Sequence, residues 1–399
     1  MKSFCHLPEE IAEEIFLRLP PKSLQCCQRV CKLWFSMIND PKFIDKQLDL
    51  SIARNKHPSS TTFFILWDKR GRVLNETFTG QVKHVLSVVT IHDKDESDGD
   101  QLPCVIEKIN FPSVPETEKE DFPVNLSLSH CNGLFFFHDT FSYTGPVFVL
   151  CNPELGEFKL LRTPCFPRSK FIFVGVGFGY DRKANDYKCV KLFSSITREM
   201  VNRAMVYSLA SDSWREVKID LNGRSSCVSP GMYHRGVFYW WNTGRQGSGA
   251  MVLTFDFSKE EFRTIPLPKH AEKWSGKIWK LTVWNESVVF FITAENLRHS
   301  KSFEMWVMVE NFGGVEGFTY WTKHLTIGPL VNIRCPLAFW KEDELLMQTR
   351  DVQIVSYNLR TQKSRKLPSP GSEWKGTIDV CLYPKSLVSL KRATTLNCR

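Results

Sequence analysis

The chain has 399 residues, of which 42% are hydrophobic and 13% aromatic, and its net charge is +9. This composition excludes a disordered chain, and the length favours a small module joined to one large domain. The basic residues are dispersed, so nucleic acid is not an expected partner. The longest apolar run, Phe171–Tyr180, is too short to cross a membrane. Thirteen irregularly spaced cysteines without a C-x-x-C pair argue against a zinc site and favour reduced thiols in a cytoplasmic or nuclear protein.

The first fifty residues are predicted to form two or three short helices. Ile11, Ile15 and Leu19 are spaced by four residues, as on one side of a helix that ends at the following proline pair. A second helix is predicted to follow and to stop at Asp40-Pro41, and residues 42–60 are expected to form a tail that leads out of the helices. A module this short cannot bury its apolar faces alone, so it requires the rest of the chain or a partner.

Four short motifs follow one another within this module. They are Leu7-Pro8-Glu9-Glu10, the run from Ile15 to Pro20, Lys22-Ser23-Leu24, and Val30-Cys31-Lys32 with Trp34 two residues later. In this order and spacing they resemble an F-box, although Gln25–Gln28 and Leu33 depart from the family pattern. Members of that family bind a Skp-type adaptor, which connects them to the cullin and the RING protein of a ubiquitin ligase. The resemblance implies that the adaptor-binding residues are Leu7, Pro8, Ile11, Ile15, Leu19, Pro20, Leu24, Val30, Cys31, Trp34 and Ile38.

Strand-like segments dominate from Thr61 onward, and two patterns repeat after residue 130. One is a turn followed by a short apolar strand, as in 131–137, 235–241, 285–291 and 342–347. The other is a hairpin with a polar turn, as in 147–161, 204–217, 251–265, 306–325 and 352–367. Successive units start roughly 45 to 60 residues apart, which is the period of a four-stranded propeller blade. We therefore expect a closed ring, in which residues 377–390 supply the strand that closes it against the first blade.

Gly175, Gly177 and Gly179 alternate within one predicted strand, so all three are expected to face the same side. The spacing is not that of a dinucleotide-binding loop, and no helix is predicted to follow it. A bare strand face of this kind is expected to let another backbone approach closely at the centre of the ring.

Further motifs lie in the large domain. They are Cys151-Asn152-Pro153 followed by Phe158, Gly177–Asp181 followed by Asp186-Tyr187-Lys188, Trp214-Arg215-Glu216, Leu325–Leu330 and Leu337–Met347. They resemble the F-box-associated domain of plant F-box proteins, and the last two are most similar to the S-locus F-box and S-locus F-box-like group. The resemblance implies a protein that is α+β by domain. A helical F-box would occupy residues 1–50, an all-β, propeller-like (kelch-type) domain of about six blades 51–390, and a tail 391–399.

No catalytic motif accompanies these patterns, whether a nucleophile elbow, an H-E-x-x-H motif or a Walker loop. We expect no catalytic residue, cofactor or metal, and interpret the chain as a subunit that holds a substrate protein near the ubiquitin carrier. The S-locus resemblance makes an S-RNase, and a role in self-incompatibility, candidates. Substrate contacts are expected from loops at one rim, with Trp274 and Phe318 as aromatic anchors. An interaction module without ligase function and a propeller enzyme are the alternatives.

Overall fold

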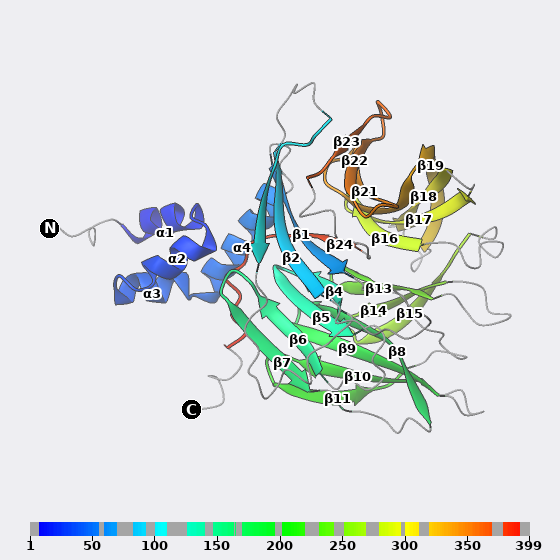
Figure 1. Ribbon diagram of the computed structural model, residues 1–399. Coiled ribbons are helices and arrows are strands. Elements are labelled where there is room, and N and C mark those ends of the chain that lie inside the picture. Colours follow the sequence, from blue (N-terminus) through cyan, green and yellow to red (C-terminus); the bar gives the residue numbers. More distant parts are fainter. Residues whose placement is uncertain are drawn as a thin grey trace.

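The computed structural model describes residues 8–55, 60–69, 83–92, 100–109, 126–139, 147–162, 164, 170–195, 202–219, 231–242, 251–268, 279–296, 300–310, 319–368 and 378–391. In this part of the chain, four helices form an N-terminal module, and six four-stranded sheets surround a central channel (Figure 1). The predicted fold class, a helical module followed by a propeller of about six blades, is confirmed. Leu7, Trp274, Phe318 and residues 392–399 lie outside the described residues.

The helical module consists of α1 (Glu9–Leu17), α2 (Pro21–Cys27), α3 (Lys32–Ile38) and α4 (Pro41–Asn55). The prediction of a single second helix is wrong, because the chain turns at residues 28–30, between α2 and α3. The predicted tail after residue 42 is also wrong, because Pro41 starts a new helix. The carboxylate of Asp40 accepts a hydrogen bond from the backbone N–H of Lys42 at 2.8 Å, and the fixed φ of proline suits a first helical turn.

Helix α4 joins the helical module to the propeller. Phe43 and Ile44 pack into the core of the module, and Leu48 is also buried. At the last residue of the helix, Asn55 is hydrogen bonded to both backbone groups of Thr62. Its Oδ1 lies 2.6 Å from the amide nitrogen, and its Nδ2 lies 3.1 Å from the carbonyl oxygen. The helix end is therefore fixed to the first blade. No helix among the described residues has the length and hydropathy to cross a membrane.

Each blade is an antiparallel sheet of four strands. In ring order they are β24 (Ile378–Leu382) with β1 (Ser60–Lys69), β2 (Lys83–His92) and β3 (Cys104–Ile109); β4 (Leu126–Cys131), β5 (Leu134–Asp139), β6 (Val147–Asn152) and β7 (Glu157–Arg162); β8 (Phe171–Asp181), β9 (Asp186–Ser195), β10 (Asn202–Ser208) and β11 (Ser213–Val217); β12 (Met232–His234), β13 (Val237–Asn242), β14 (Met251–Asp256) and β15 (Glu261–Pro266); β16 (Trp279–Trp284), β17 (Ser287–Asn296), β18 (Ser300–Glu310) and β19 (Thr319–Val331); and β20 (Ile333–Phe339), β21 (Glu344–Thr349), β22 (Ile354–Asn358) and β23 (Ser364–Lys366). The last strand, β24, pairs with β1, with Val380 opposite Ile65. The predicted closure of the ring is confirmed.

The two ends of the ring differ in what they face. Within each blade the chain runs back and forth, so successive strand connections alternate between the ends. The turns between the first and second strands of four blades include Asn132, Asn185, Arg235 and Glu286, and these residues line the same cavity as α4. We call this the near end. In each blade, the end of the second strand and the start of the third lie at the opposite end of the ring. We call this the far end.

The glycine-rich strand β8 shows how the blades pack together. A Cβ at Gly177 would lie 2.7 Å from a ring carbon of Trp240 and 2.9 Å from one of Phe238, both in the next blade. The expectation of a close approach is thus confirmed, but aromatic side chains rather than a backbone fill the space. A bulge between Phe173 and Gly175 interrupts the alternation of the strand, which the sequence pattern did not indicate.

Candidate functional site

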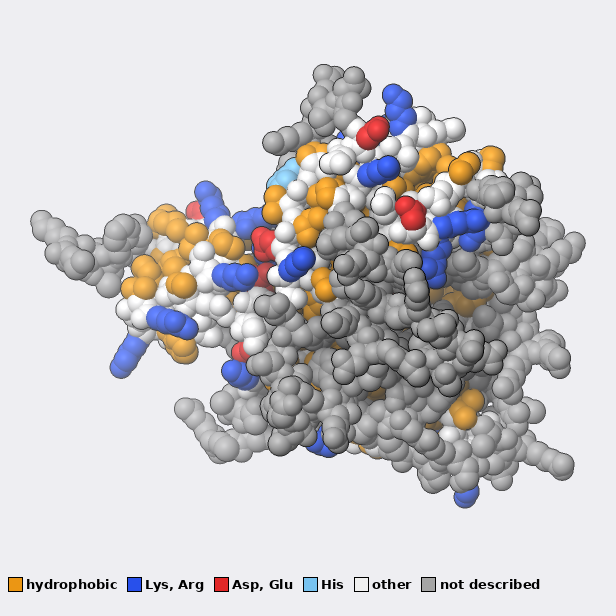
Figure 2. All heavy atoms as spheres, in the orientation of Figure 1, with side chains coloured by type: hydrophobic (Ala, Val, Ile, Leu, Met, Phe, Trp, Pro, Cys, Tyr) orange, Lys and Arg blue, Asp and Glu red, His pale blue; other side chains and the backbone are white. Residues whose placement is uncertain are grey.

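The helical module exposes apolar side chains that the propeller does not cover. Ile11 and Ile15, one turn apart on α1, are 46% and 45% exposed, and Val30, Leu33 and Phe35 are 63%, 52% and 55% exposed. We call these five residues the apolar face. Figure 2 shows hydrophobic side chains gathered over this module, to the left of the propeller. Exposed apolar groups concentrated in one place mark a site of protein interaction.

The same helices bury their other sides in a core of their own. Ala12 and Phe16, also one turn apart on α1, are buried, and the ring of Phe16 meets that of Trp34 edge-on at 4.9 Å between centroids. Leu24 and Ile38 are fully buried in this core. They hold α2 and α3 in place, and in this conformation they offer no surface to a partner.

The residues predicted to bind an adaptor therefore fall into separate groups. Pro8, Ile11, Ile15, Pro20 and Val30 are exposed; Leu19, Cys31 and Trp34 are partly buried; Leu24 and Ile38 are interior; and Leu7 lies outside the described residues. The sequence pattern missed Leu33 and Phe35 of the apolar face. Their signal was present in the sequence, because both are apolar residues outside the spacing that α3 uses for its buried side.

The last described segment connects the module to the propeller. Residues 383–390, which we call the strap, follow β24 and pass the near end of the second blade (Figure 1). Leu387 is buried among Phe16, Ile38 and other residues of the helical core. Three residues later, Leu390 is buried in the core between the second and third blades. One short segment thus completes both cores.

Polar groups of the second blade hold the strap in place. The amide Nδ2 of Asn152 donates to the carbonyl oxygens of Ser386 at 3.0 Å and Val388 at 2.8 Å. The carboxylate of Glu157 accepts the backbone N–H of Leu390 at 2.7 Å. Asn152 is completely buried, so these bonds form where water does not compete. The Cys-Asn-Pro motif of the sequence therefore has a structural role, because it fixes the strap that attaches the helical module to the propeller.

Replacing Leu387 with Ala is expected to loosen the helical module while leaving the propeller intact. Truncating a buried leucine costs about 2 to 5 kcal/mol, and here the loss falls on the core shared by the helices and the strap. Hydrogen exchange should quicken in residues 9–55 and stay slow in the blades. Leu390→Ala is the matched control, since it should instead quicken exchange in the second and third blades. Equal patterns for both variants would contradict the assignment of the two side chains to different cores.

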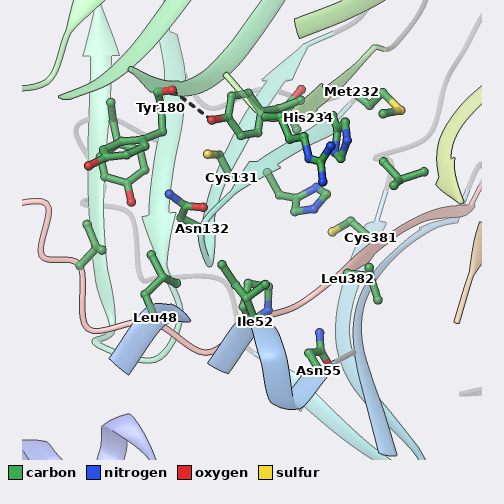
Figure 3. Close-up of a pocket in the computed structure, with 18 of the residues that line it drawn as sticks. Leu48, Ile52, Asn55, Cys131, Asn132, Tyr180, Met232, His234, Cys381 and Leu382 are labelled. Atoms are coloured by element: carbon green, nitrogen blue, oxygen red, sulfur yellow. Dashed lines mark hydrogen bonds between the residues drawn. The ribbon is translucent and has the colours of Figure 1, made fainter. Parts of the chain in front are cut away.

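A cavity of about 1160 Å³ occupies the channel between α4 and the blades. Figure 3 shows Leu48 and Ile52 of the helix below it and Cys131, Asn132 and Tyr180 of the blades above. Burial raises the pKa of the Cys131 thiol well above its usual range, so this thiol is protonated. Burial, with the nearby charge of Lys280, lowers the pKa of His130 to about 4, so the imidazole is neutral near pH 7. The described residues contain no group of His, Cys, Asp and Glu side chains placed to hold a metal ion.

The predicted anchors Trp274 and Phe318 lie outside the described residues, so their role in substrate binding stays a prediction. The described strand ends that flank Trp274, at Pro266 and Trp279, lie at the far end of the ring. The strand ends that flank Phe318, at Glu310 and Thr319, lie at the near end. The described strand ends on either side of the two anchors therefore lie at opposite ends of the ring.

Comparison with protein families defines the class of this protein. Residues 83–390 match the F-box associated beta propeller domain, and residues 4–51 match the F-box-like family. The first match covers most of the chain and includes every described strand of the ring except β1. The protein belongs to the family of F-box proteins that carry an F-box-associated β-propeller. This confirms the family indicated by the sequence motifs.

Curated relatives of this chain occur in Arabidopsis thaliana. Putative F-box protein At3g16210 is 28% identical over 66% of this chain and 61% of its own length, and Putative F-box/kelch-repeat protein At3g20710 is 26% identical over 66% and 64%. The chain thus spans slightly less than two thirds of these two relatives. Putative F-box/kelch-repeat protein At3g22730 is 24% identical over 90% of this chain and 85% of its own. A solved oligogalacturonate lyase in complex with manganese aligns with a TM-score of 0.36 at 9% identity, over 61% of this chain and 63% of the lyase. A likeness this weak does not indicate shared chemistry.

Proposed function

We propose that this protein is the substrate-recognition subunit of a Skp–cullin–F-box ubiquitin ligase. The helical module binds a Skp-type adaptor and reaches the cullin and the RING protein through it, while the propeller holds a substrate protein. The subunit is not catalytic. It acts by proximity, because holding the substrate raises the effective concentration of its lysines at the ubiquitin carrier. We place this activity in the cytoplasm or the nucleus.

The observation that supports this proposal is that the apolar face stays exposed although α4 and the strap already attach the module to the propeller. Leu387 of the strap and Phe43 of α4 pack into the core of the module. Ile11, Ile15 and Val30 are not part of that core and are exposed. The module and the propeller can therefore bind two different proteins at the same time. Apolar side chains at the centre of a contact supply most of its binding energy.

The S-locus resemblance suggests a finer proposal about the substrate. Residues 325–330 and 337–347 carry that resemblance, which makes an S-RNase a candidate substrate and self-incompatibility a candidate process. Binding of a purified S-RNase to the full chain is the corresponding test. Failure of a panel of S-RNases to bind would remove this candidate and leave the ligase proposal in place.

The direct test of the proposed function is a titration of the purified full chain with a purified Skp-type adaptor. We expect a saturable complex with one adaptor per chain. The alternative, an interaction module without ligase function, predicts no binding in the same experiment. An absence of binding by the native, folded chain would reject the ligase proposal.

A further inference from the structure

The side of α4 that faces the ring lines the channel cavity from one end of the helix to the other. Ile44, Leu48, Ile52 and Asn55, which are spaced by three or four residues, all belong to the wall of the cavity. Figure 3 shows three of them on the helix, with the blades on the opposite side of the cavity. Because open space separates most of this side from the blades, packing against the ring contributes little to the direction of the helix.

Two contacts at opposite ends of α4 attach the helix to the propeller. In its first turns, Phe43 and Ile44 share a core with Leu387 of the strap. At its last residue, the side chain of Asn55 is hydrogen bonded to Thr62 of the first blade. The covalent link through residues 56–59 would not fix a direction by itself, because each residue has two rotatable backbone angles. The direction of the helical module therefore depends on the strap and on Asn55.

Asn55 bonds to the first blade at the point where the last strand of the ring stops pairing. Leu382 on β24 lies opposite Phe63 on β1, so Tyr383 and Thr62 would form the next pair. The N–H of Tyr383 does donate to the carbonyl oxygen of Thr62, at 2.9 Å. The N–H of Thr62, however, donates to the Oδ1 of Asn55 at 2.6 Å. The asparagine thus supplies the acceptor that a longer β24 would offer, and its amide group also supplies a donor to the same residue.

The same junction is connected to the second blade. Tyr383 is 1% exposed, and its hydroxyl group donates to the carboxylate of Glu154 at 3.1 Å. The backbone N–H of Glu154 donates in turn to Asn152, the residue that holds the strap. Both attachments of α4 therefore end in one hydrogen-bonded network on the first two blades. Networks of this kind, formed in buried surroundings, hold their members in a single arrangement.

We propose that Asn55 is a positioning residue for ubiquitin transfer. It sets the direction of the helical module relative to the propeller, and so it decides which lysines of a held substrate come within reach of the ubiquitin carrier. This inference rests on the proposed function. Helix α4 has 15 residues and is about 22 Å long, so a rotation of about 20° around the strap would displace its other end by about 8 Å. Displacements far smaller than this change the rate of transfer between two bound groups.

The first test measures the direction of the module by cross-linking lysines of the full chain and identifying the linked pairs by mass spectrometry. Lys22 and Lys32 of the module are exposed and serve as reporters. Asn55→Leu removes both hydrogen bonds at nearly constant size, and it should add cross-links from the module to propeller lysines that the native chain does not link. Asn55→Asp, which keeps the acceptor for the Thr62 N–H, should show the same change to a smaller degree and guards against a folding defect of the first variant.

Asn358→Leu is the matched control, because it removes similar hydrogen bonds far from the module. The side chain of Asn358 donates to Glu344 at 3.0 Å and accepts the backbone N–H groups of Arg360 and Thr361. Both asparagines are partly buried. The control should keep the native cross-links, so that a general loss of stability is separated from a change of direction.

The second test measures transfer in a reaction with adaptor, cullin, RING protein, ubiquitin carrier and cell extract. Asn55→Leu should bind the adaptor within about twofold of the native affinity and should retain the same extract proteins. Transfer to the lysines that the native chain modifies should fall at least about threefold, and other lysines of the same proteins should become modified. The control should modify the native set of lysines.

Unchanged cross-links in both Asn55 variants would overturn the inference, and so would new cross-links with an unchanged set of modified lysines. An equal effect of Asn358→Leu would also overturn it, because loss of stability alone would then explain the result. A native chain that does not bind the adaptor would reject the proposed function, and this inference with it. A native chain that binds the adaptor and transfers ubiquitin, with no effect of the Asn55 variants, would reject this inference alone.

Discussion

Replacing both Ile11 and Ile15 with Asp is expected to abolish adaptor binding without unfolding the protein. The two side chains are nearly half exposed, so the substitutions leave the core of the module untouched. In the complex, however, they would place two carboxylates in an apolar contact without partners. A penalty of roughly 4 kcal/mol in total corresponds to about a thousandfold loss of affinity. The measurements are the dissociation constant for a Skp-type adaptor and the melting temperature of the free chain.

The control for this prediction carries the same chemical change on the propeller. Val105 on β3 and Val331 on β19 are 52% and 73% exposed, so Val105→Asp/Val331→Asp adds the same charge away from the helices. The control variant should bind the adaptor with native affinity. If the α1 variant kept its affinity, or if both variants lost it equally, the apolar face would not be the adaptor-binding surface.

Lys188→Met is expected to destabilise the propeller by about 3 kcal/mol, because it leaves the buried carboxylate of Asp181 without its cation. The Nζ of Lys188 lies 2.6 Å from Asp181 of its own blade and 2.8 Å from Glu260 of the next. The side chains of the lysine and of Asp181 are only 9% and 3% exposed. Lys323→Met is the matched control, since its 2.6 Å ion pair with Glu304 is much more exposed and contributes about 1 kcal/mol or less. Chemical denaturation of both variants gives the comparison.

The same substitution changes how stability depends on pH. Burial would raise the pKa of Asp181 and Glu260, but hydrogen bonds from Lys188, Ser258 and Arg215 outweigh it and hold both values below the ordinary range. Carboxyl groups with a lowered pKa stabilise the fold above about pH 4 and lose this contribution as the pH falls through the folded-state values. The free-energy difference between native and Lys188→Met should therefore shrink below about pH 4. A difference that stays constant from pH 7 to the acid range would contradict the role of the ion pairs.

The ring was predictable because its signals are local. Short apolar strands after turns recur along the chain, and each turn fixes which strands pair. The turn residues Asn132, Arg235 and Asn285 have φ of 53°, 48° and 46°, a conformation suited to tight hairpins. The closure of the ring followed from a leftover strand at the end of the sequence. These features needed no knowledge of contacts between distant residues.

The attachment of the helical module to the propeller could not be predicted from these local sequence patterns. Pro41 follows the end of α3 and starts α4, whereas its position in the sequence was interpreted only as the end of a helix. The side chain that completes the helical core, Leu387, is more than three hundred residues away from it. Helical spacing identified Leu24 and Ile38 as apolar positions, but it did not show whether they face a partner or the chain itself.

Ubiquitin transfer in a reconstituted reaction tests whether the apolar face connects proteins held by the propeller to the ligase. The native chain and its Ile11→Asp/Ile15→Asp variant would each be combined with adaptor, cullin, RING protein and ubiquitin carrier in a cell extract, and the modified proteins would be identified by mass spectrometry. We expect a set of proteins that bind the propeller of both chains but receive ubiquitin only with the native chain. The same set of modified proteins with both chains, or none with the native chain, would contradict this expectation.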